Sequence, residues 1–403
     1  MEGSRRRARS RAARSAATAA AVAHLAPLAF RVAVALIGRN ARAAPAAAPA
    51  DPPAYTVLGA LRGEEARAGR WIDAVAALHH PRERLDVMVL VEADDAPTRR
   101  AAERAARRLG EPGWLRVVTV PPGEPRTKPR ALAHGLALAR GDLLVVYDAE
   151  DVPDPWQLRD AAAVFAAGGP RLACVQARPA VVPPRGDALG RVMAAEYRLW
   201  HGGFLPGLAR LGAPVPLAGT SNHLRVAALR AVGGWDPRNV AEDADLGVRL
   251  ARAGLRTRTI ASPTREESTP EGVAAWVRQR SRWSRGFVQT WLAALRPRGA
   301  LRRELGAGRA ACVHLTIAGT VASQLAAPAA WILCPAAAMA GVLLRLAGCR
   351  ALRGGAEGLG AAALAAPAAS LLEGVAAWRG LWLLARDPGR WERTAHPVRP
   401  GSP

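Results

Sequence analysis

Hydrophobic runs alternate with helix-like stretches along residues 55–147 of this chain. Short apolar runs are typical of buried strands, whereas the stretches between them have the length of ordinary helices. Strands alternating with helices in this way predict parallel pairing in a doubly wound sheet, which binds ligands at the carboxyl ends of its strands. The expected strands are 55–61, 86–91, 115–120 and 143–147, and the expected helices are 66–79, 96–109 and 129–140.

The hydrophobic pattern changes after about residue 300. Residues 310–344 contain no Asp, Glu, Lys or Arg. A helix of this length, at about 1.5 Å per residue, exceeds one bilayer core of roughly 30 Å. Pro328 and Pro335 lie within this stretch and predict either a bent helix or a tight pair of spans. A second apolar stretch, 359–385, ends in AAWRGLWLLAR, which is typical of an interfacial helix.

The beginning of the chain divides into three segments. Residues 1–14 are an arginine-rich leader, expected to be disordered or to lie on anionic lipid. Residues 15–37 are largely apolar, but Pro27 and Arg31 interrupt them. They also lack the uninterrupted core and the cleavage site of a secretory signal, so we expect an uncleaved interfacial segment. Residues 41–53 are an Ala/Pro linker.

Arginine supplies nearly all of the positive charge. The chain has 56 Lys+Arg against 33 Asp+Glu, a net charge of +23, and Lys128 is its only lysine. A nucleic-acid binder would be the obvious function at this charge, but it would need stacking aromatics. Aromatic residues make up only 5% of the chain. The arginine and alanine content therefore indicates coding bias and membrane orientation, and we expect no nucleic-acid partner.

Acidic side chains follow two of the expected strands. Three carboxylates close together repel one another unless solvent or a cation screens them. Mg²⁺ typically takes one or two carboxylates together with phosphate oxygens of its substrate. We therefore expect the second cluster to bind a divalent cation, the alternative being a solvated turn that caps the next helix. The first cluster is Glu92, Asp94 and Asp95, and the second is Asp148, Glu150 and Asp151.

Two further motifs lie later in the chain. Glu242 and Asp243 precede an apolar helical pattern, where acids also serve as helix caps. In WVRQRSRW, Gln279, Arg282 and Trp283 are three and four residues apart and share one face of a helix. An arginine beside an indole can bind a pyrophosphate and offer a flat platform to a sugar ring. Each motif alone has an ordinary structural explanation, but the ordered set does not.

Taken in this order, the motifs resemble those of the glycosyltransferase family two enzymes, the group of cellulose-synthase-like bacterial membrane transferases. The resemblance covers roughly residues 55–300, and its specific part is the pair formed by Asp243 and, 36 residues later, Gln279. The family's nucleotide site, DxD metal site, ED motif and Q-x-x-R-W motif match Asp94/Asp95, Asp148-Ala149-Glu150, Glu242-Asp243 and Gln279-Arg280-Ser281-Arg282-Trp283.

The resemblance implies a GT-A-type doubly wound mixed sheet followed by C-terminal transmembrane or interfacial helices. The implied domains are a leader region 1–53, a catalytic domain 54–300, a membrane region 301–386 and a basic tail 387–403. It also implies an inverting transferase that moves a sugar from a nucleotide-diphosphate donor, expected to be a UDP-sugar. The acceptor would be a polysaccharide or glycolipid at the bacterial cytoplasmic membrane, and the cofactor Mg²⁺ or Mn²⁺.

The same resemblance assigns roles to individual residues. Asp243, with Glu242 beside it, would be catalytic, and the second acidic cluster, Asp148, Glu150 and Asp151, would hold the metal. The donor would be bound by Glu92, Asp94, Asp95, Lys128 and Arg282. The acceptor would contact Gln279, Trp283, Thr220, Ser221 and Asn222. Lys128 independently indicates a diphosphate site, because a compact ammonium suits a diphosphate. An equal alternative is that this single lysine is present by chance in an arginine-rich chain.

Three departures from the family pattern keep other readings open. Glu150 replaces the second aspartate of DxD, residues 57–66 lack the usual opening motif, and His134 stands where the family commonly has Asn. The altered opening motif and Glu150 are the only support for a catalytically inactive membrane scaffold. A polyprenyl-phosphate sugar transferase of the same fold is the other alternative, and Q-x-x-R-W argues against it.

The charge distribution generates a prediction about topology. Nucleotide sugars are made in the cytoplasm, and basic flanks favour that side of the membrane. Residues 15–37 should therefore not span, and residues 310–385 should cross an even number of times, most simply twice. Reporters placed in the 41–53 linker and after Pro403 should both read cytoplasmic. An external signal from the linker would show that residues 15–37 do span.

Overall fold

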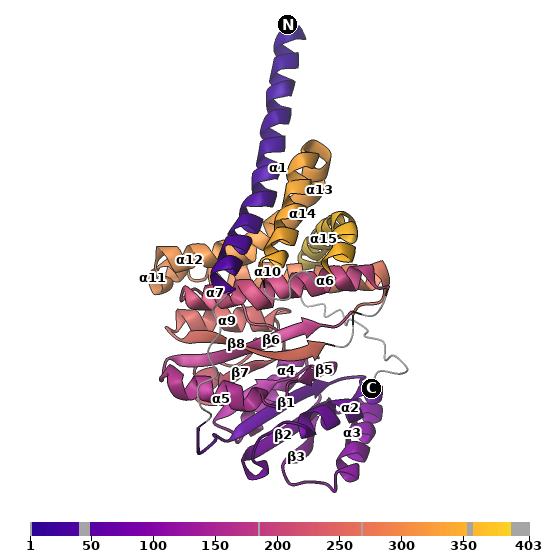
Figure 1. Ribbon diagram of the computed structural model, residues 1–403, viewed down its shortest axis with the longest axis vertical. Coiled ribbons are helices and arrows are strands. Elements are labelled where there is room, and N and C mark those ends of the chain that lie inside the picture. Colours follow the sequence, from indigo (N-terminus) through magenta and orange to yellow (C-terminus); the bar gives the residue numbers. More distant parts are fainter. Residues whose placement is uncertain (1, 40–48, 184–185, 267–268, 353–357, 388–403) are drawn as a thin grey trace.

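The computed structural model of the protein describes residues 2–39, 49–183, 186–266, 269–352 and 358–387. A body built around one sheet occupies the lower part of the molecule, and long helices rise from its upper side (Figure 1). Most of the predicted 41–53 linker and nearly all of the predicted basic tail lie outside the described residues.

The first half of the body consists of strand–helix repeats. Every residue of β2 is buried, which explains why it reads as one continuous apolar run. All seven elements expected from the hydrophobic pattern are confirmed, with ends that shift by at most three residues. The elements are β1 (Tyr55–Leu61), α2 (Glu65–Ala76), β2 (Leu85–Glu92), α3 (Ala96–Arg108), β3 (Leu115–Val120), α4 (Lys128–Leu138) and β4 (Leu143–Val146).

The order of the strands places a ligand crevice beside β1 and β4. Eight strands form one sheet in the order β3-β2-β1-β4-β7-β6-β8-β5, with β1 parallel to both β2 and β4. The chain builds outward from β1 to β3 and then returns to the other side of β1. Such a reversal leaves a crevice outside the carboxyl ends of the two central strands. Asp148 follows the end of β4 by two residues and stands at this position.

The later strands make the sheet mixed. β7 pairs antiparallel with both β4 and β6, whereas β6 and β8 are parallel and β5 closes the edge antiparallel to β8. This confirms the doubly wound mixed sheet. The strands are β5 (Asp151–Pro153), β6 (Leu172–Val181), β7 (Asn222–Arg225) and β8 (Arg256–Glu266). The helices among them are α5 (Gln157–Gly168), α6 (Ala188–Leu199), α7 (Leu205–Arg210), α8 (Val226–Ala231) and α9 (Glu242–Arg252).

Helix α10 (Gly272–Ala294) joins the body to the long helices. It packs on α9 on the side of the body and on α15 (Leu359–Arg386) on the other side. Where α10 meets α15, a Cβ on Gly380 would lie 2.7 Å from the carbonyl oxygen of Ser281. Only glycine at this position allows the two helices to pack so closely. The helix that carries the Q-x-x-R-W motif is therefore held from both sides.

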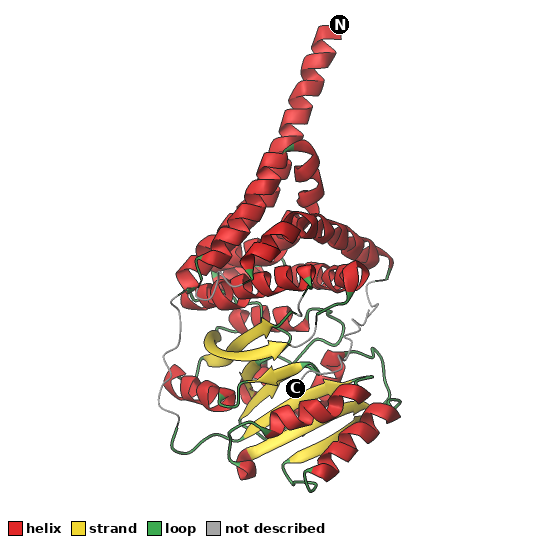
Figure 2. Ribbon diagram, turned by 45° about the vertical axis from the view of Figure 1, so that its right-hand side comes forward, coloured by secondary structure: helices red, strands yellow, loops and turns green. Residues whose placement is uncertain are grey.

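The long helices form a bundle above the sheet (Figure 2). By length and composition, three helical segments in the described part of the chain could cross a membrane: Ser10–Gly38, Ala307–Leu333 and Leu359–Arg386. The chain leaves helical geometry at Cys334, so Pro335 begins a second helix, whereas Pro328 lies inside α13 (Gly319–Leu333). The bundle consists of α1 (Glu2–Gly38), α13, α14 (Pro335–Arg350) and α15, and α11 (Ala300–Leu305) and α12 (Ala307–Val313) lead into it.

Helix α1 packs lengthwise against α13. The guanidinium of Arg31 donates a hydrogen bond of 2.8 Å to the hydroxyl of Thr320, and Ser323 Oγ donates one of 2.8 Å to the carbonyl of His24. Because α1 begins at Glu2, the leader is helical and not disordered. Helix α1 thus lies beside α13, and both belong to segments long and apolar enough to cross a membrane. The interfacial placement of 15–37 stays a prediction, and this packing counts against it.

The end of α1 docks on the body by backbone contact. A Cβ on Gly207 of α7 would lie 2.0 Å from the carbonyl oxygen of Val34, and a Cβ on Gly38 would lie 1.9 Å from that of Gly203. Main chains that approach this closely leave no room for any side chain. The position of α1 on the catalytic body is therefore fixed by these glycines.

Gly207→Ala should destabilise the protein by about 1–3 kcal/mol, because the added methyl group meets backbone that cannot rotate away. Thermal unfolding of the full chain in detergent measures this change. Gly360→Ala is the matched control, since nothing lies within 4 Å of a Cβ at that position of α15. Equal melting temperatures for the two variants would contradict the described docking.

Candidate active site

A cavity of about 880 Å³ lies between the sheet and the helix bundle. It opens at the carboxyl ends of β1 and β4, where the strand order reverses. All four sequence motifs contribute to its wall, although they are up to 191 residues apart. The predicted site residues that line it are Glu92, Lys128, Asp148, Glu150, Thr220, Glu242, Asp243, Gln279, Arg282 and Trp283.

Lys128 lies at the centre of the acidic part of this cavity. Its ammonium forms an ion pair with Asp148 and donates a hydrogen bond of 2.7 Å to the carbonyl oxygen of Gly219. Burial alone would lower the pKa of Lys128, but the surrounding carboxylates, Asp148 foremost, raise it above its usual value. The only lysine of the chain is therefore a permanent cation at the point where the strand order reverses.

Gly219 is the position where three motifs meet. A Cβ at this residue would lie 3.3 Å from Asp243 Oδ2, 3.7 Å from Lys128 Nζ and 3.9 Å from Asp148 Oδ2. The absence of a side chain lets Asp243, Lys128 and Asp148 face the same small volume. Gly219 was not predicted as a site residue from the sequence, where it directly precedes the predicted acceptor contact Thr220.

The Glu242–Asp243 pair begins α9 at the cavity wall. Burial, followed by the charge of Asp243, raises the pKa of Glu242 to about 8. Burial also raises the pKa of Asp243, but a hydrogen bond from the Ala244 amide and the charges of Lys128 and Arg282 oppose the increase. Near neutral pH Glu242 therefore retains its proton.

Helix α10 presents the Q-x-x-R-W residues to the cavity on one face, as the spacing predicts. Gln279 is buried, and its Oε1 has no hydrogen-bond partner among the described residues. The guanidinium of Arg280 lies 5.0 Å from the ring centre of Trp276 and 4.5 Å from that of Trp283, and donates to Glu196 at 2.7 Å. Arg280, absent from the predicted site, thus fixes the indole that was expected to contact the acceptor.

The carboxylates beside Asp148 fit a divalent cation bound together with a diphosphate. Burial, followed by the charges of Glu150 and Asp148, raises the pKa of Glu266 to about 8. These acids therefore repel one another, and a bound cation would relieve the repulsion. Within the described ranges no group of three or more His, Cys, Asp or Glu side chains could hold a metal ion. A cation with phosphate ligands needs only one or two carboxylates, which Asp148 and Glu150 supply.

The early acidic motif contributes less to the cavity than we expected. Glu92 lines the cavity, and its carboxylate accepts a hydrogen bond of 2.6 Å from the guanidinium of Arg130. Asp94 does not line the cavity and pairs with Arg126. Asp95 caps α3, where its carboxylate accepts from the amides of Thr98 and Gly63. The structure thus places both aspartates outside the cavity wall, and Asp95 has a helix-capping role.

Three other predicted site residues also lie outside the cavity wall. Asp151 is buried in β5, where its carboxylate accepts from the hydroxyl of Thr220 and the amide of Asp148. Ser221 donates to Thr264 at 2.6 Å, and Asn222 donates to the carbonyl of Ala218 at 2.7 Å. These side chains hold the loops that carry Asp148 and Thr220. The metal and acceptor roles that the resemblance gives these three residues stay predictions.

The comparison with protein families identifies the chain. A family model described as glycosyl transferase family group 2 matches residues 143–344, which include the end of β4, the Glu242–Asp243 pair and the Q-x-x-R-W helix. The chain belongs to this family. Known family members with similar sequences are distant from it and longer.

Two bacterial relatives illustrate the distance. The probable glycosyltransferase YdaM of Bacillus subtilis is 26% identical over 53% of this chain and 50% of its own length. The β-monoglucosyldiacylglycerol synthase of Synechocystis is 28% identical over 56% of this chain and 46% of its own length. The chain thus spans about half the length of the curated relatives it matches.

A solved structure extends the likeness of the fold beyond the matched segment. The mannosyltransferase of Pyrobaculum calidifontis, solved in complex with GDP-Man and Mn²⁺, superposes with a TM-score of 0.61 at 22% identity. The superposition covers 89% of this chain and 99% of the other. This family member therefore has the GT-A-like fold of that enzyme, as the motifs had implied.

The electrostatics of the site give a prediction for Lys128→Met. Loss of the ammonium removes a charge that holds down the pKa of Asp243, so this pKa should rise further. If turnover requires ionised Asp243, the acidic limb of the pH profile of kcat/KM should move to higher pH. Lys128→Arg, which keeps the charge, should leave the limb in place. A shift of the Lys128→Met limb to lower pH would contradict this electrostatic account.

Proposed function

We propose that this protein is an inverting glycosyltransferase of the cytoplasmic membrane, with its catalytic body facing the cytoplasm. It moves a sugar from a nucleotide-diphosphate donor, a UDP-sugar, to a hydroxyl of a glycolipid or growing polysaccharide. The observation that carries this proposal is the convergence of Lys128, Asp148 and Asp243 around Gly219. This arrangement combines a general base, a cation for the diphosphate and a carboxylate for a metal in one volume.

The donor end of the cavity suits a diphosphate. Lys128 offers a compact ammonium and Arg282 a planar guanidinium, two complementary ways to bind phosphate oxygens. A divalent cation held by Asp148 and Glu150 would offset the charge that develops on the leaving diphosphate. The repulsion among the acids of this region supports such a cation, and the Mn²⁺ reported with the Pyrobaculum enzyme agrees with it.

Asp243 is the base in the proposed reaction. The acceptor oxygen attacks the anomeric carbon, its proton passes to Asp243, and the bond to the diphosphate breaks with its electrons leaving on phosphate. Attack on the face opposite the leaving group inverts the configuration of that carbon. Glu242 retains its own proton near neutral pH, so it does not compete as the base.

The acceptor is expected to lie against α10. Gln279 Oε1, unpartnered among the described side chains, can accept a hydrogen bond from an acceptor hydroxyl. Trp283, held by Arg280, offers the flat apolar surface on which sugar rings pack. The cavity wall offers a carboxylate, two cations and an indole that suit these roles. Their presence argues against the inactive scaffold and, with Q-x-x-R-W, favours a hydroxyl acceptor over polyprenyl phosphate.

Asp243→Asn tests the proposal. The amide cannot take the acceptor proton, so turnover should fall by at least about 100-fold. Donor binding should persist, because the carboxylate contributes little to holding the nucleotide. The measurement is nucleoside-diphosphate release from a donor screen with Mg²⁺ or Mn²⁺, combined with direct nucleotide binding by calorimetry.

Asp236→Asn is the matched control, since Asp236 is exposed and lies outside the cavity. It should retain wild-type turnover. Full activity of Asp243→Asn would refute the assignment of the base. Equal loss of nucleotide binding and turnover would show instead that Asp243 has a structural role.

A further inference from the structure

The cavity continues from the motif residues into the helix bundle. Its upper part is bounded by the end of α6 and by α1, α13, α14 and α15, none of which carries a family motif. The wall there combines apolar side chains with a few polar ones. The residues that matter below are Arg31, Trp200, Thr320, Leu346, Ala362 and Ala366.

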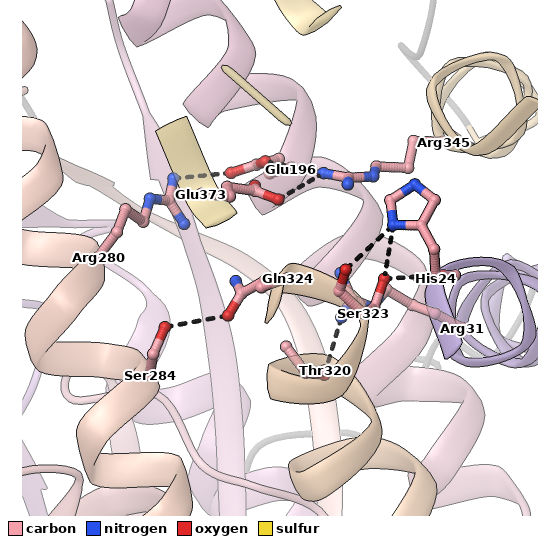
Figure 3. A network of polar contacts seen from close by, with 10 residues as sticks. All are labelled: His24, Arg31, Glu196, Arg280, Ser284, Thr320, Ser323, Gln324, Arg345 and Glu373. Atoms are coloured by element: carbon pink, nitrogen blue, oxygen red, sulfur yellow. Dashed lines mark hydrogen bonds and ion pairs between the residues drawn. The ribbon is translucent and has the colours of Figure 1, made fainter. Parts of the chain in front are cut away.

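Most charges in this upper part neutralise one another. Arg280 pairs with Glu196 at 2.7 Å, and Arg345 pairs with Glu373 at 2.9 Å (Figure 3). Arg345 also lies 3.7 Å from Glu196, so the contact that joins the two pairs runs from α14 of the bundle to α6. The two pairs leave no net charge for a ligand to balance.

Arg31 is different, because it has no carboxylate partner. Its guanidinium donates to the Thr320 hydroxyl at 2.8 Å and lies 4.9 Å from the ring centre of Trp200. In the described part of the chain no carboxylate comes within 4 Å of it, and Arg31 faces the cavity. A cation among membrane helices is costly unless an anion or water compensates it. The Nε of Arg345, also on the cavity wall, lacks a hydrogen-bond partner among the described residues.

We propose that Arg31 binds the phosphate of an anionic membrane lipid and that this lipid is the acceptor. The assignment rests on the proposed function, and it narrows the acceptor to a lipid with a phosphodiester and a free hydroxyl in its headgroup. The hydroxyl extends toward Asp243 and gives it its proton. The new bond joins the hydroxyl oxygen to the anomeric carbon, and the diphosphate leaves with the electrons of the broken bond.

The surroundings of Arg31 favour a lipid over a soluble phosphate. Leu346, Ala362 and Ala366 line the same part of the cavity and offer apolar contact to an acyl chain. Helices α1 and α15 contribute to this wall and are long and apolar enough to cross a bilayer, which is the environment of a membrane lipid. A free phosphate would gain nothing from this apolar wall.

The test measures lipid binding directly and therefore does not depend on turnover. The full chain in a non-ionic detergent is titrated with short-chain phosphatidylglycerol, and binding is followed by native mass spectrometry. Arg31→Gln should weaken binding by about tenfold, the usual effect of losing one charge-assisted hydrogen bond. Arg39→Gln is the matched control, because Arg39 is an exposed arginine eight residues further along and outside the cavity. It should bind as the wild type does.

A second variant keeps the proposal testable if Arg31→Gln does not fold. Thr320→Asp supplies Arg31 with an internal carboxylate, so it should fold and still lose affinity for the anionic lipid. Unchanged binding in both variants would overturn the site. Displacement of the lipid by inorganic phosphate at similar concentration would show a free-phosphate site and would also overturn the proposal.

The acceptor role has its own readout. Wild-type protein given a UDP-sugar should glycosylate phosphatidylglycerol in vesicles, and Arg31→Gln should raise KM for the lipid. Transfer to a soluble oligosaccharide but never to lipid would overturn the acceptor role. A wild-type chain that binds no nucleotide donor would instead refute the proposed function, and the lipid titration would still decide whether Arg31 forms an anion site.

Discussion

The site depends on one ammonium group among carboxylates. Lys128 pairs with Asp148 and donates a hydrogen bond to the Gly219 carbonyl. Its charge lowers the pKa of Glu242 and of Asp243, which burial raises. Without a cation at this point, both of these pKa values would rise further. Gly219 makes this arrangement possible, because its lack of a side chain lets Lys128, Asp148 and Asp243 approach one another.

Helix α10 packs against the helix bundle and also lines this site. Its Arg280 lies between two indoles and pairs with Glu196, and its backbone meets Gly380 of α15 in close contact. The same helix presents Gln279, Arg282 and Trp283 to the cavity. The positions of these three side chains are therefore set partly by helices that carry no family motif.

The sequence predicts the strand–helix repeats well, because each element follows a local period in hydrophobicity. It also predicts Lys128, Asp148 and the two later motifs, which gather at one crevice once the sheet is parallel. The predicted ligands Asp95, Asp151 and Ser221 also have backbone or core partners, which local sequence cannot show because those partners come from the folded chain. Arg31 was not predicted as a functional residue. In the sequence it only interrupts an apolar run, and its partner Thr320 belongs to α13, almost 300 residues later.

The central claim is that one cavity places the donor diphosphate between Lys128 and Arg282, with the anomeric carbon facing Asp243. The most direct test is a structure of the full chain in a lipid nanodisc, bound to Mn²⁺ and a non-hydrolysable UDP-sugar. We expect the diphosphate to contact Lys128 and Arg282, the metal to contact Asp148, and the sugar C1 to lie on the Asp243 side. A nucleotide bound away from Gly219, or a sugar shielded from Asp243, would contradict the account.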